Sequence, residues 1–263
     1  MKIDRVIFCL NSNPLYSSFW NIFSRVWSEK FKIKPTVFFS GTEEDLHNAA
    51  LSDEFGDIIR LDPVPEVILR PSMDWSITWA LFWGPTLFPE EVCMTSGLDQ
   101  LPLNNFFIDY IKDIDEEDYI VGFSNAYNNP SLFPSSHHVS KGKNFKKIYK
   151  IENDWEDEIK KVFKMGKENY MPQLSNPENK GMWGLDEVYS SDVIVKNEHN
   201  FSNFHHCNFF HSNWINKRVG RCAIINYDKH KLINGEYTEF HSPRPYLKHK
   251  DYIDELISDL IKK

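Results

Sequence analysis

The first half of the chain alternates short apolar runs with segments of helical periodicity, and this alternation constrains its fold more than any other feature. Apolar runs of strand length lie at residues 6–10, 36–41, 57–62 and 119–123, with a further run that ends just before Gly97. Helical spacing of apolar residues predicts helices over residues 17–30 and 75–88. Strands that alternate with helices predict an α/β fold, with a mostly parallel central sheet covered by helices on both faces.

The second half of the chain is less regular. A helix is predicted to begin after Asn153 or Asp154, either of which can cap it. The other predicted elements are irregular strands at residues 135–151, a loop at 169–184, a short helix at 186–195, a strand at 221–227 and a terminal amphipathic helix at 248–263. Because no repeat and no interdomain linker is evident, we expect a single domain over residues 1–263.

Composition and charge narrow the classes of function. The chain has 263 residues, of which 41% are hydrophobic and 26% charged, as is ordinary for a globular protein with a substantial core. Its formal net charge is −8. A protein that binds duplex nucleic acid usually presents a basic face, so we expect no nucleic-acid partner despite a local basic cluster at residues 141–150.

The sequence also bears on the compartment. Its four cysteines are widely spaced and form no CxxC pair, which favours a reducing environment. The N-terminus has no signal-peptide pattern, and no apolar stretch is long enough to span a bilayer. We therefore expect a soluble, cytoplasmic protein with no transmembrane segment.

An acidic residue follows the buried run that ends at Ser96 and Gly97. This residue is Asp99, and Pro102 then keeps the same strand from continuing. Ligands of open α/β sheets bind in the crevice at the carboxyl ends of the strands. Asp99 is therefore a candidate for holding a divalent metal on a diphosphate. The alternative is that Asp99 only caps the turn.

Two later segments carry further candidates. Trp183-Gly184 is followed, after one residue, by Asp186 and Glu187. These acidic residues are candidates for proton transfer, although the dipole at a helix start also attracts such side chains. The second segment is residues 241–245, where a histidine and an arginine lie in a loop that two prolines stiffen.

Together, the order of elements and these motifs resemble the A-type glycosyltransferases, whose GT-A fold binds nucleotide sugars. In that family a short Asp-x-Asp motif at a strand end holds Mn²⁺ or Mg²⁺ on the donor diphosphate. The resemblance implies that Asp99 is the second acid of this motif, with Gly97 in place of the first. It also implies that His241 returns to the metal and that Arg244 neutralises the leaving diphosphate. Arginine suits phosphate oxygens geometrically.

The resemblance assigns the remaining roles. An inverting transfer needs a general base opposite the leaving diphosphate, and Asp186 is the first choice for it and Glu187 the second. Trp183 and Gly184 would contact a carbohydrate or other hydroxyl acceptor. Residues 1–125 would bind the donor, expected to be a UDP sugar, and residues 126–263 the acceptor. The donor contacts expected from this resemblance are Asn11, Asn13, Asp62, Ser96, Gly97, Lys141 and Arg244.

Two alternatives stay open. His205, His206, Cys207 and His211 have spacing that can serve Zn²⁺, which would indicate a zinc-dependent hydrolase. With Gly97 in place of an acid, the chain could instead be a transferase-like carbohydrate-binding protein without turnover. The Lys141 segment also has a plainer interpretation as a basic turn. No Gly-x-Ser-x-Gly, Gly-x-Gly-x-x-Gly or Walker motif is present, which argues against serine hydrolases, dinucleotide oxidoreductases and P-loop enzymes.

Overall fold

A seven-stranded sheet forms the centre of the computed structural model, which describes residues 1–67, 76–127, 129–170, 184–197, 203–207, 218–219 and 229–262. Its strands are β1 (Arg5–Asn11), β2 (Lys34–Ser40), β3 (Asp57–Leu61), β4 (Val92–Thr95), β6 (Tyr119–Gly122), β7 (His138–Lys141) and β8 (Phe204–Cys207). They are ordered β3-β2-β1-β4-β7-β6-β8. Only β7 runs antiparallel to its neighbours, so the predicted mostly parallel α/β sheet is confirmed.

The central strands are apolar on both faces because each face is covered by helices. Along β1, Val6, Phe8 and Leu10 pack into one core cluster, whereas Ile7 packs into another on the opposite face. The neighbouring strand repeats this alternation, with Phe38 in the second cluster. A one-residue slip would exchange the two faces, so this pattern fixes the register of the strands.

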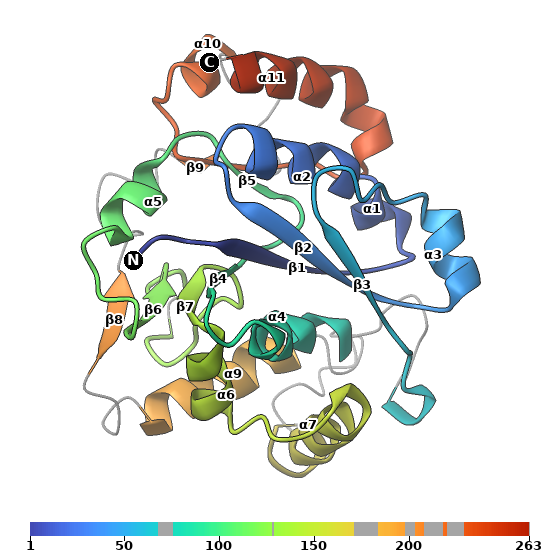
Figure 1. Ribbon diagram of the computed structural model, residues 1–263, viewed down its shortest axis with the longest axis vertical. Coiled ribbons are helices and arrows are strands. Elements are labelled where there is room, and N and C mark those ends of the chain that lie inside the picture. The colour runs from blue at the N-terminus through green and yellow to red at the C-terminus, as the bar shows by residue number, and fades with distance from the viewer. Residues whose placement is uncertain are drawn as a thin grey trace.

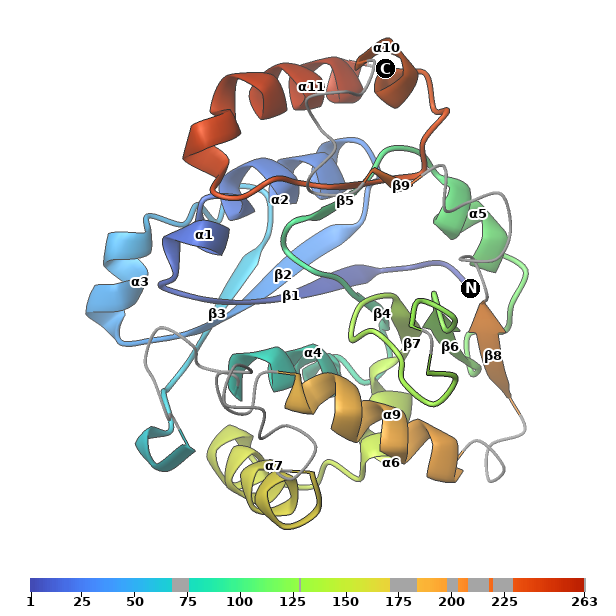
Figure 2. The same ribbon diagram turned by 180° about the vertical axis from the view of Figure 1, so that it is seen from behind.

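Helices form a layer on each side of the sheet (Figures 1 and 2). One layer contains α1 (Pro14–Ser17), α2 (Trp20–Glu29) and α11 (Lys250–Lys262). The other contains α4 (Ala80–Trp83), α6 (Gly142–Tyr149), α7 (Trp155–Asn169) and α9 (Leu185–Asn197). The remaining short helices are α3 (Glu43–Ala49), α5 (Phe106–Ile111) and α10 (Lys229–Ile233). Within the described residues, no helix is long and apolar enough to cross a bilayer.

A second, three-stranded sheet brings the end of the chain back to the turn after β4. It has the order β5 (Gln100–Pro102), β10 (Glu239–His241) and β9 (Arg218–Val219), and it lies beside α2 and α11 (Figures 1 and 2). In the antiparallel pairing of β5 with β10, His241 is the partner of Gln100. The chain thus leaves β4 as expected and enters a different sheet, in which Pro102 is the last residue of β5.

Several elements differ from the prediction. Residues 135–151, expected to be irregular strands, form β7 followed at once by α6, whose Phe145, Ile148 and Tyr149 are buried. Helix α6 begins at Gly142, where only glycine fits because a Cβ would lie 2.1 Å from the carbonyl oxygen of Pro85. The helix predicted over 17–30 is present as α2, with the separate short α1 before it, whereas the one predicted over 75–88 consists of short 3-10 and α segments. The strand predicted at 221–227 lies outside the described residues.

The helices predicted in the second half are present. Asp154, one of two candidate caps, is the N-cap of α7, and its side chain accepts a hydrogen bond from the Asp157 backbone N–H at 3.0 Å. Helix α9 covers the short helix predicted at 186–195, and α11 covers most of the terminal one. These helices were predictable because caps and amphipathic spacing are local signals.

Candidate active site

A cleft of about 460 Å³ opens at the carboxyl ends of β1 and β4. It is lined by the turn after β1, the turn between β4 and β5, the loop before β7 and the start of α9. The predicted residues that line it are Asn11, Asn13, Gly97, Asp99, Gly184, Asp186, Glu187 and His241. Residues from both halves of the chain therefore meet in one cleft, at the sheet edge where open α/β sheets bind ligands.

At one end of the cleft, Asp99 lies next to His241 and Arg244. The Asp99 carboxylate is almost fully buried, and its Oδ2 is 3.3 Å from His241 Nε2 and 3.4 Å from Arg244 Nε. The backbone explains this convergence. The Ser242 N–H donates to the Asp99 carbonyl at 2.8 Å, just beyond the pairing of β5 with β10. The three predicted residues of the diphosphate end are thus brought together.

The donor atoms of Asp99 and His241 fit a divalent metal. His241 Nε2 is buried and forms no hydrogen bond, and it faces the Asp99 carboxylate. Two adjacent ligand atoms of an octahedral Mg²⁺, each at about 2.1 Å, are about 3 Å apart. The observed 3.3 Å separation is close to this value. Among the described residues no group of three or more His, Cys, Asp or Glu side chains is placed to hold a metal, so phosphate and water would complete the shell.

Gly97 leaves room that a neighbouring amide side chain occupies. The Gly97 N–H donates to Gln100 Oε1 at 3.3 Å, and a Cβ on Gly97 would lie 3.0 Å from Gln100 Cδ. The neutral Gln100 amide therefore occupies the space into which a side chain at residue 97 would extend. Neither residue adds a negative charge beside Asp99.

Asp186 is the more buried of the two carboxylates in the first turn of α9. Its Oδ2 accepts a hydrogen bond from the Ser135 hydroxyl, and the Thr78 hydroxyl also hydrogen-bonds to its side chain. Burial raises the pKa of Asp186, and these hydrogen bonds oppose that rise. Asp186 is only 5% exposed, so an acceptor has little access to it.

Glu187 is half-buried and more accessible from the cleft. Its Oε1 accepts a hydrogen bond from the Tyr127 hydroxyl at 2.8 Å. Burial, and then the neighbouring charge of Asp186, raise the pKa of Glu187 to about 7. A carboxylate whose pKa lies close to the working pH is well suited to accept a proton. Both acidic residues also lie in the first turn of α9, so each of them is at a helix start and in the cleft at the same time.

The turn before α9 brings these carboxylates to the cleft. Gly184, with a φ of 91°, adopts the left-handed conformation that favours glycine, and it lines the cleft. Trp183, the predicted acceptor platform, lies outside the described residues. Asn11 Oδ1 accepts from the Asn13 N–H at 3.0 Å, and Asn13 Oδ1 caps α1 by accepting from the Leu15 N–H at 3.0 Å. These bonds fix the turn after β1 at the mouth of the cleft.

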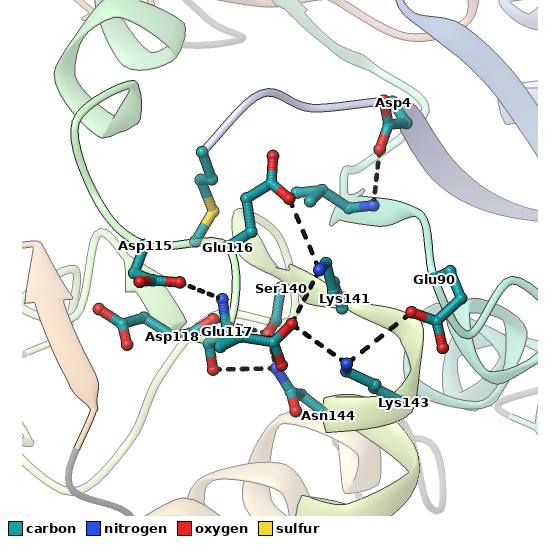
Figure 3. Close-up of polar contacts among 12 residues, drawn as sticks. Asp4, Glu90, Asp115, Glu116, Glu117, Asp118, Ser140, Lys141, Lys143 and Asn144 are labelled. Carbon is teal, nitrogen blue, oxygen red and sulfur yellow. Dashed lines mark hydrogen bonds and ion pairs between the residues drawn. The ribbon is translucent and has the colours of Figure 1, made fainter.

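Lys141 lies at the opposite end of the sheet from the cleft, contrary to the expected phosphate contact. The reason is the direction of β7. This strand is antiparallel to β4, and Lys141, its last residue, pairs with Val92, the first residue of β4. There Lys141 Nζ is 2.8 Å from Glu117 and 3.6 Å from Glu116, and Lys143 joins the same cluster (Figure 3). The segment is not the basic turn of the alternative interpretation either, because Lys141 ends β7 and Gly142 begins α6.

Asp62 and Ser96 also lie outside the cleft. The Asp62 side chain is largely exposed just past β3, where it pairs with Arg60 at 2.5 Å. Ser96 is buried and lines a separate cavity of about 30 Å³ behind the cleft. Neither position supports the donor contact that the resemblance implied.

The residues that line the cleft but were not predicted include Tyr16, Gln100 and Tyr127. Tyr16 follows β1, and the Arg244 guanidinium lies over its ring, 4.6 Å from the ring centre. Tyr127 follows β6, which ends at the same sheet edge as β4 because both strands are antiparallel to β7. The rule that selected Asp99, a polar residue after a parallel strand, would also have selected these two tyrosines.

The histidine-rich segment does not form a metal cluster among the residues that the structure describes. His205 and His206 point to opposite faces of β8. His205 Nε2 is 2.7 Å from Asp118 Oδ2, whereas the His206 ring packs against Phe133. Cys207 is buried. His211 lies outside the described residues, and the described part of the segment does not favour the zinc-hydrolase alternative.

Several solved glycosyltransferase structures resemble this chain. The galactosyltransferase LgtC, solved in complex with donor and acceptor sugar analogs, is 12% identical with a TM-score of 0.49, over 98% of this chain and 95% of that one. The glycosyltransferase GlyE of Streptococcus pneumoniae TIGR4 is 12% identical with a TM-score of 0.48, over 100% of this chain and 63% of its own length. The bifunctional glycosyltransferase WbbM is 13% identical with a TM-score of 0.41, over 98% of this chain and 50% of its own length.

All three are glycosyltransferases, the class that the sequence motifs resemble. No protein-family model and no curated protein matches the sequence. At identities of 12–13% and TM-scores of 0.41–0.49, these likenesses assign no function to this chain.

Proposed function

We propose that this chain is a glycosyltransferase that moves a sugar from a nucleoside diphosphate sugar, expected to be a UDP sugar, to a hydroxyl acceptor. One observation carries the proposal. One cleft has a cation-binding end, formed by Asp99 and His241 with Arg244 beside Asp99, and a carboxylate end, formed by Asp186 and Glu187. An inverting sugar transfer uses both features, one for the leaving diphosphate and one for the acceptor proton.

At the cation-binding end, Asp99 and His241 would hold Mn²⁺ or Mg²⁺. Such an ion supplies positive charge that stabilises the leaving diphosphate. Arg244 adds a permanent charge at the same end, in a guanidinium geometry that matches phosphate oxygens. Asn11 and Asn13, at the mouth of the cleft, are proposed to flank the base and ribose.

At the carboxylate end, Glu187 is proposed as the general base, ahead of Asp186. In an inverting transfer the acceptor oxygen attacks the anomeric carbon as the bond from that carbon to the phosphate oxygen breaks. The acceptor proton passes to Glu187 Oε2 or Oε1, and the electron pair of the broken bond leaves with the diphosphate. Asp186, bonded to Ser135 and Thr78, would hold the start of α9 in place. Trp183 remains a predicted acceptor contact.

The proposed setting is a reducing compartment such as the cytoplasm. Among the described residues Cys9, Cys93 and Cys207 form no disulfide, as such a setting allows. The proposed partners are the nucleotide sugar and a carbohydrate or other hydroxyl acceptor, with no nucleic acid.

Calorimetric titration with UDP, GDP, CMP and ADP, each with and without Mn²⁺, tests the proposal. A ligand that binds only the folded state also raises its apparent stability, so a thermal-shift series provides a second readout. We expect one diphosphate to bind in a metal-dependent way and Asp99→Asn to remove that dependence. Failure of every nucleotide to bind would reject the proposal.

Turnover separates an enzyme from a carbohydrate-binding protein that has lost activity. The measurement is release of free sugar from the donor selected above, with Glu187→Gln as the inactive comparison. We expect wild-type protein to hydrolyse the donor slowly without an acceptor. Metal-dependent donor binding without any hydrolysis or transfer would favour the non-catalytic alternative.

A further inference from the structure

One oxygen of Asp99, Oδ2, faces both His241 and Arg244. A metal held by Asp99 and His241 would therefore have to share this oxygen with Arg244. His241 Nε2 lies 3.3 Å and Arg244 Nε 3.4 Å from Asp99 Oδ2. The Asp99 side chain is 5% exposed, so few other directions of approach remain. The Tyr16 ring also helps to hold Arg244 in this position, because the Arg244 guanidinium lies over the ring, 4.6 Å from its centre. Arg244 therefore occupies the neighbourhood that an ion on Asp99 would enter.

The charges at this end of the cleft nearly cancel. Asp99 contributes one negative charge and Arg244 one positive charge, whereas the chain has Gly97 and the neutral Gln100 where a second carboxylate could lie. An ion that enters alone would approach a guanidinium of like charge within a few ångströms. In a partly buried site that repulsion is stronger than it is in water. A bound diphosphate would reverse the balance, because it adds negative charge for both cations.

We propose that Arg244 and a divalent cation compete for Asp99, so that the nucleotide-free protein binds the ion weakly. A diphosphate would relieve the competition by giving the Arg244 guanidinium phosphate oxygens in place of Asp99. This second part rests on the proposed function, whereas the competition itself depends only on Asp99, His241 and Arg244. Arg244 is here a positioning residue that sets the order in which the site fills.

Binding of Mn²⁺ alone tests the competition, measured by electron paramagnetic resonance of the free ion in the absence of nucleotide. Arg244→Gln removes the charge but keeps a long polar side chain. We expect it to bind Mn²⁺ at least about tenfold more tightly than wild type, as loss of one nearby like charge implies. Arg244→Lys retains the charge and should stay near the wild-type affinity. An Arg244→Gln affinity equal to or below that of wild type would overturn the proposal.

Two controls locate the effect. Arg25→Gln changes the net charge equally but lies on α2, where Arg25 is paired with Glu29 on the surface, and it should leave Mn²⁺ affinity unchanged. Asp99→Asn combined with Arg244→Gln should lose the gain. If the double variant keeps tight Mn²⁺ binding, the ion sits elsewhere and the competition is wrong. Circular dichroism of each variant verifies that it is folded.

A second titration separates this inference from the proposed function. Mn²⁺ affinity is measured again with saturating UDP, which should raise it far more in wild type than in Arg244→Gln. Tighter Mn²⁺ binding by Arg244→Gln, with no effect of a nucleotide, would support the competition and count against a nucleotide-sugar donor. Nucleotide-dependent Mn²⁺ binding, with no tighter Mn²⁺ binding by Arg244→Gln than by wild type, would support a nucleotide-sugar donor and overturn the competition.

Discussion

At the scale of single residues, the chemistry of the cleft depends on which of two adjacent carboxylates an acceptor can reach. Asp186 is nearly enclosed, with hydroxyl partners, whereas Glu187 is half-buried and shares one oxygen with the Tyr127 hydroxyl. The resemblance implied Asp186 as the first choice, because a sequence motif does not report burial. The accessible and more weakly held carboxylate is the better candidate for receiving a proton.

The rate of transfer should depend on pH through Glu187. The base must be ionised, so the rate should fall as the pH drops below the Glu187 pKa of about 7. Glu187→Gln should lower the rate by roughly 10²–10⁴-fold, the range for loss of general base catalysis, and should abolish this acid limb. Initial rates between pH 5 and 9, at saturating donor, measure both.

Glu44→Gln on α3 is the matched control for this experiment, because Glu44 is exposed and lies far from the residues that line the cleft. It should leave the rate and the acid limb as in wild type. An unchanged acid limb in Glu187→Gln would assign proton transfer to another residue, with Asp186→Asn the next variant to examine.

Gly97 and Gln100 together should determine how strongly the chain binds metal. The backbone at Gly97 is not in the left-handed region, so an aspartate fits once Gln100 no longer occupies the space. We expect Gly97→Asp with Gln100→Ala to bind Mn²⁺ more tightly than Gln100→Ala alone, because a second carboxylate joins the shell. Calorimetric titration with Mn²⁺ measures the difference. Equal affinities would indicate that residue 97 does not face the ion.

At the scale of elements, the small three-stranded sheet brings the residues of the cation-binding end together. The pairing of β5 with β10 places His241 opposite Gln100 and therefore beside Asp99. A second link lies two residues earlier, where Glu239 Oε2 is 2.7 Å from His137 Nε2, and both side chains are 7% exposed. The Phe107 and Phe123 rings pack against His137. This buried pair joins the small sheet to the loop that leads into β7.

Breaking that pair should destabilise the protein. Glu239→Ala leaves the His137 imidazole buried without its partner, and leaving a buried polar group unsatisfied typically costs about 1–3 kcal/mol. Urea unfolding measures the free energy of unfolding. Glu236→Ala is the matched control. Glu236 is exposed and lies 3.9 Å from its partner Lys231, so its loss should change stability little. Equal effects of the two variants would show that the pair does not support the fold.

At the scale of the whole molecule, the cleft lowers stability when its carboxyl groups are ionised, because it buries two of them next to each other. Burial raises the pKa of both Asp186 and Glu187 above their ordinary values. A carboxyl group whose pKa is higher in the folded state favours folding while it is protonated. That contribution is complete below the unfolded pKa and is lost as the pH rises through the folded pKa.

This linkage predicts a pH-dependent difference between wild type and Glu187→Gln. Between about pH 4.5 and 7, wild type should lose stability relative to the variant, because only wild type acquires the buried charge. One pKa unit corresponds to about 1.4 kcal/mol, and partial exposure reduces the total to roughly 2 kcal/mol. Chemical unfolding of both proteins at pH 4.5, 6 and 8 measures the difference. A constant difference across this range would contradict the raised pKa.

Local signals in the sequence determined the elements that need no distant partner. Apolar runs of strand length located β1, β2, β3, β4 and β6 but not β8, and the Asp154 cap with its amphipathic face located α7. The position of Asp99 after a strand was enough to predict that it would line a crevice, whereas the prediction for Asp186 and Glu187 came from the resemblance of their motif. These predictions succeeded because hydrogen-bonding pattern, side-chain period and capping depend on neighbours in the chain.

Only the tertiary structure decided which predicted residues meet. The antiparallel direction of β7 carries Lys141 to the far edge of the sheet, and no local pattern in the sequence specifies that direction. The pairing of β5 with β10 brings Asp99 to His241 and Arg244 across a long stretch of chain. Burial then separates Glu187 from Asp186. Strand direction, long-range pairing and burial arise from packing of the whole chain, so they were decided only when it folded.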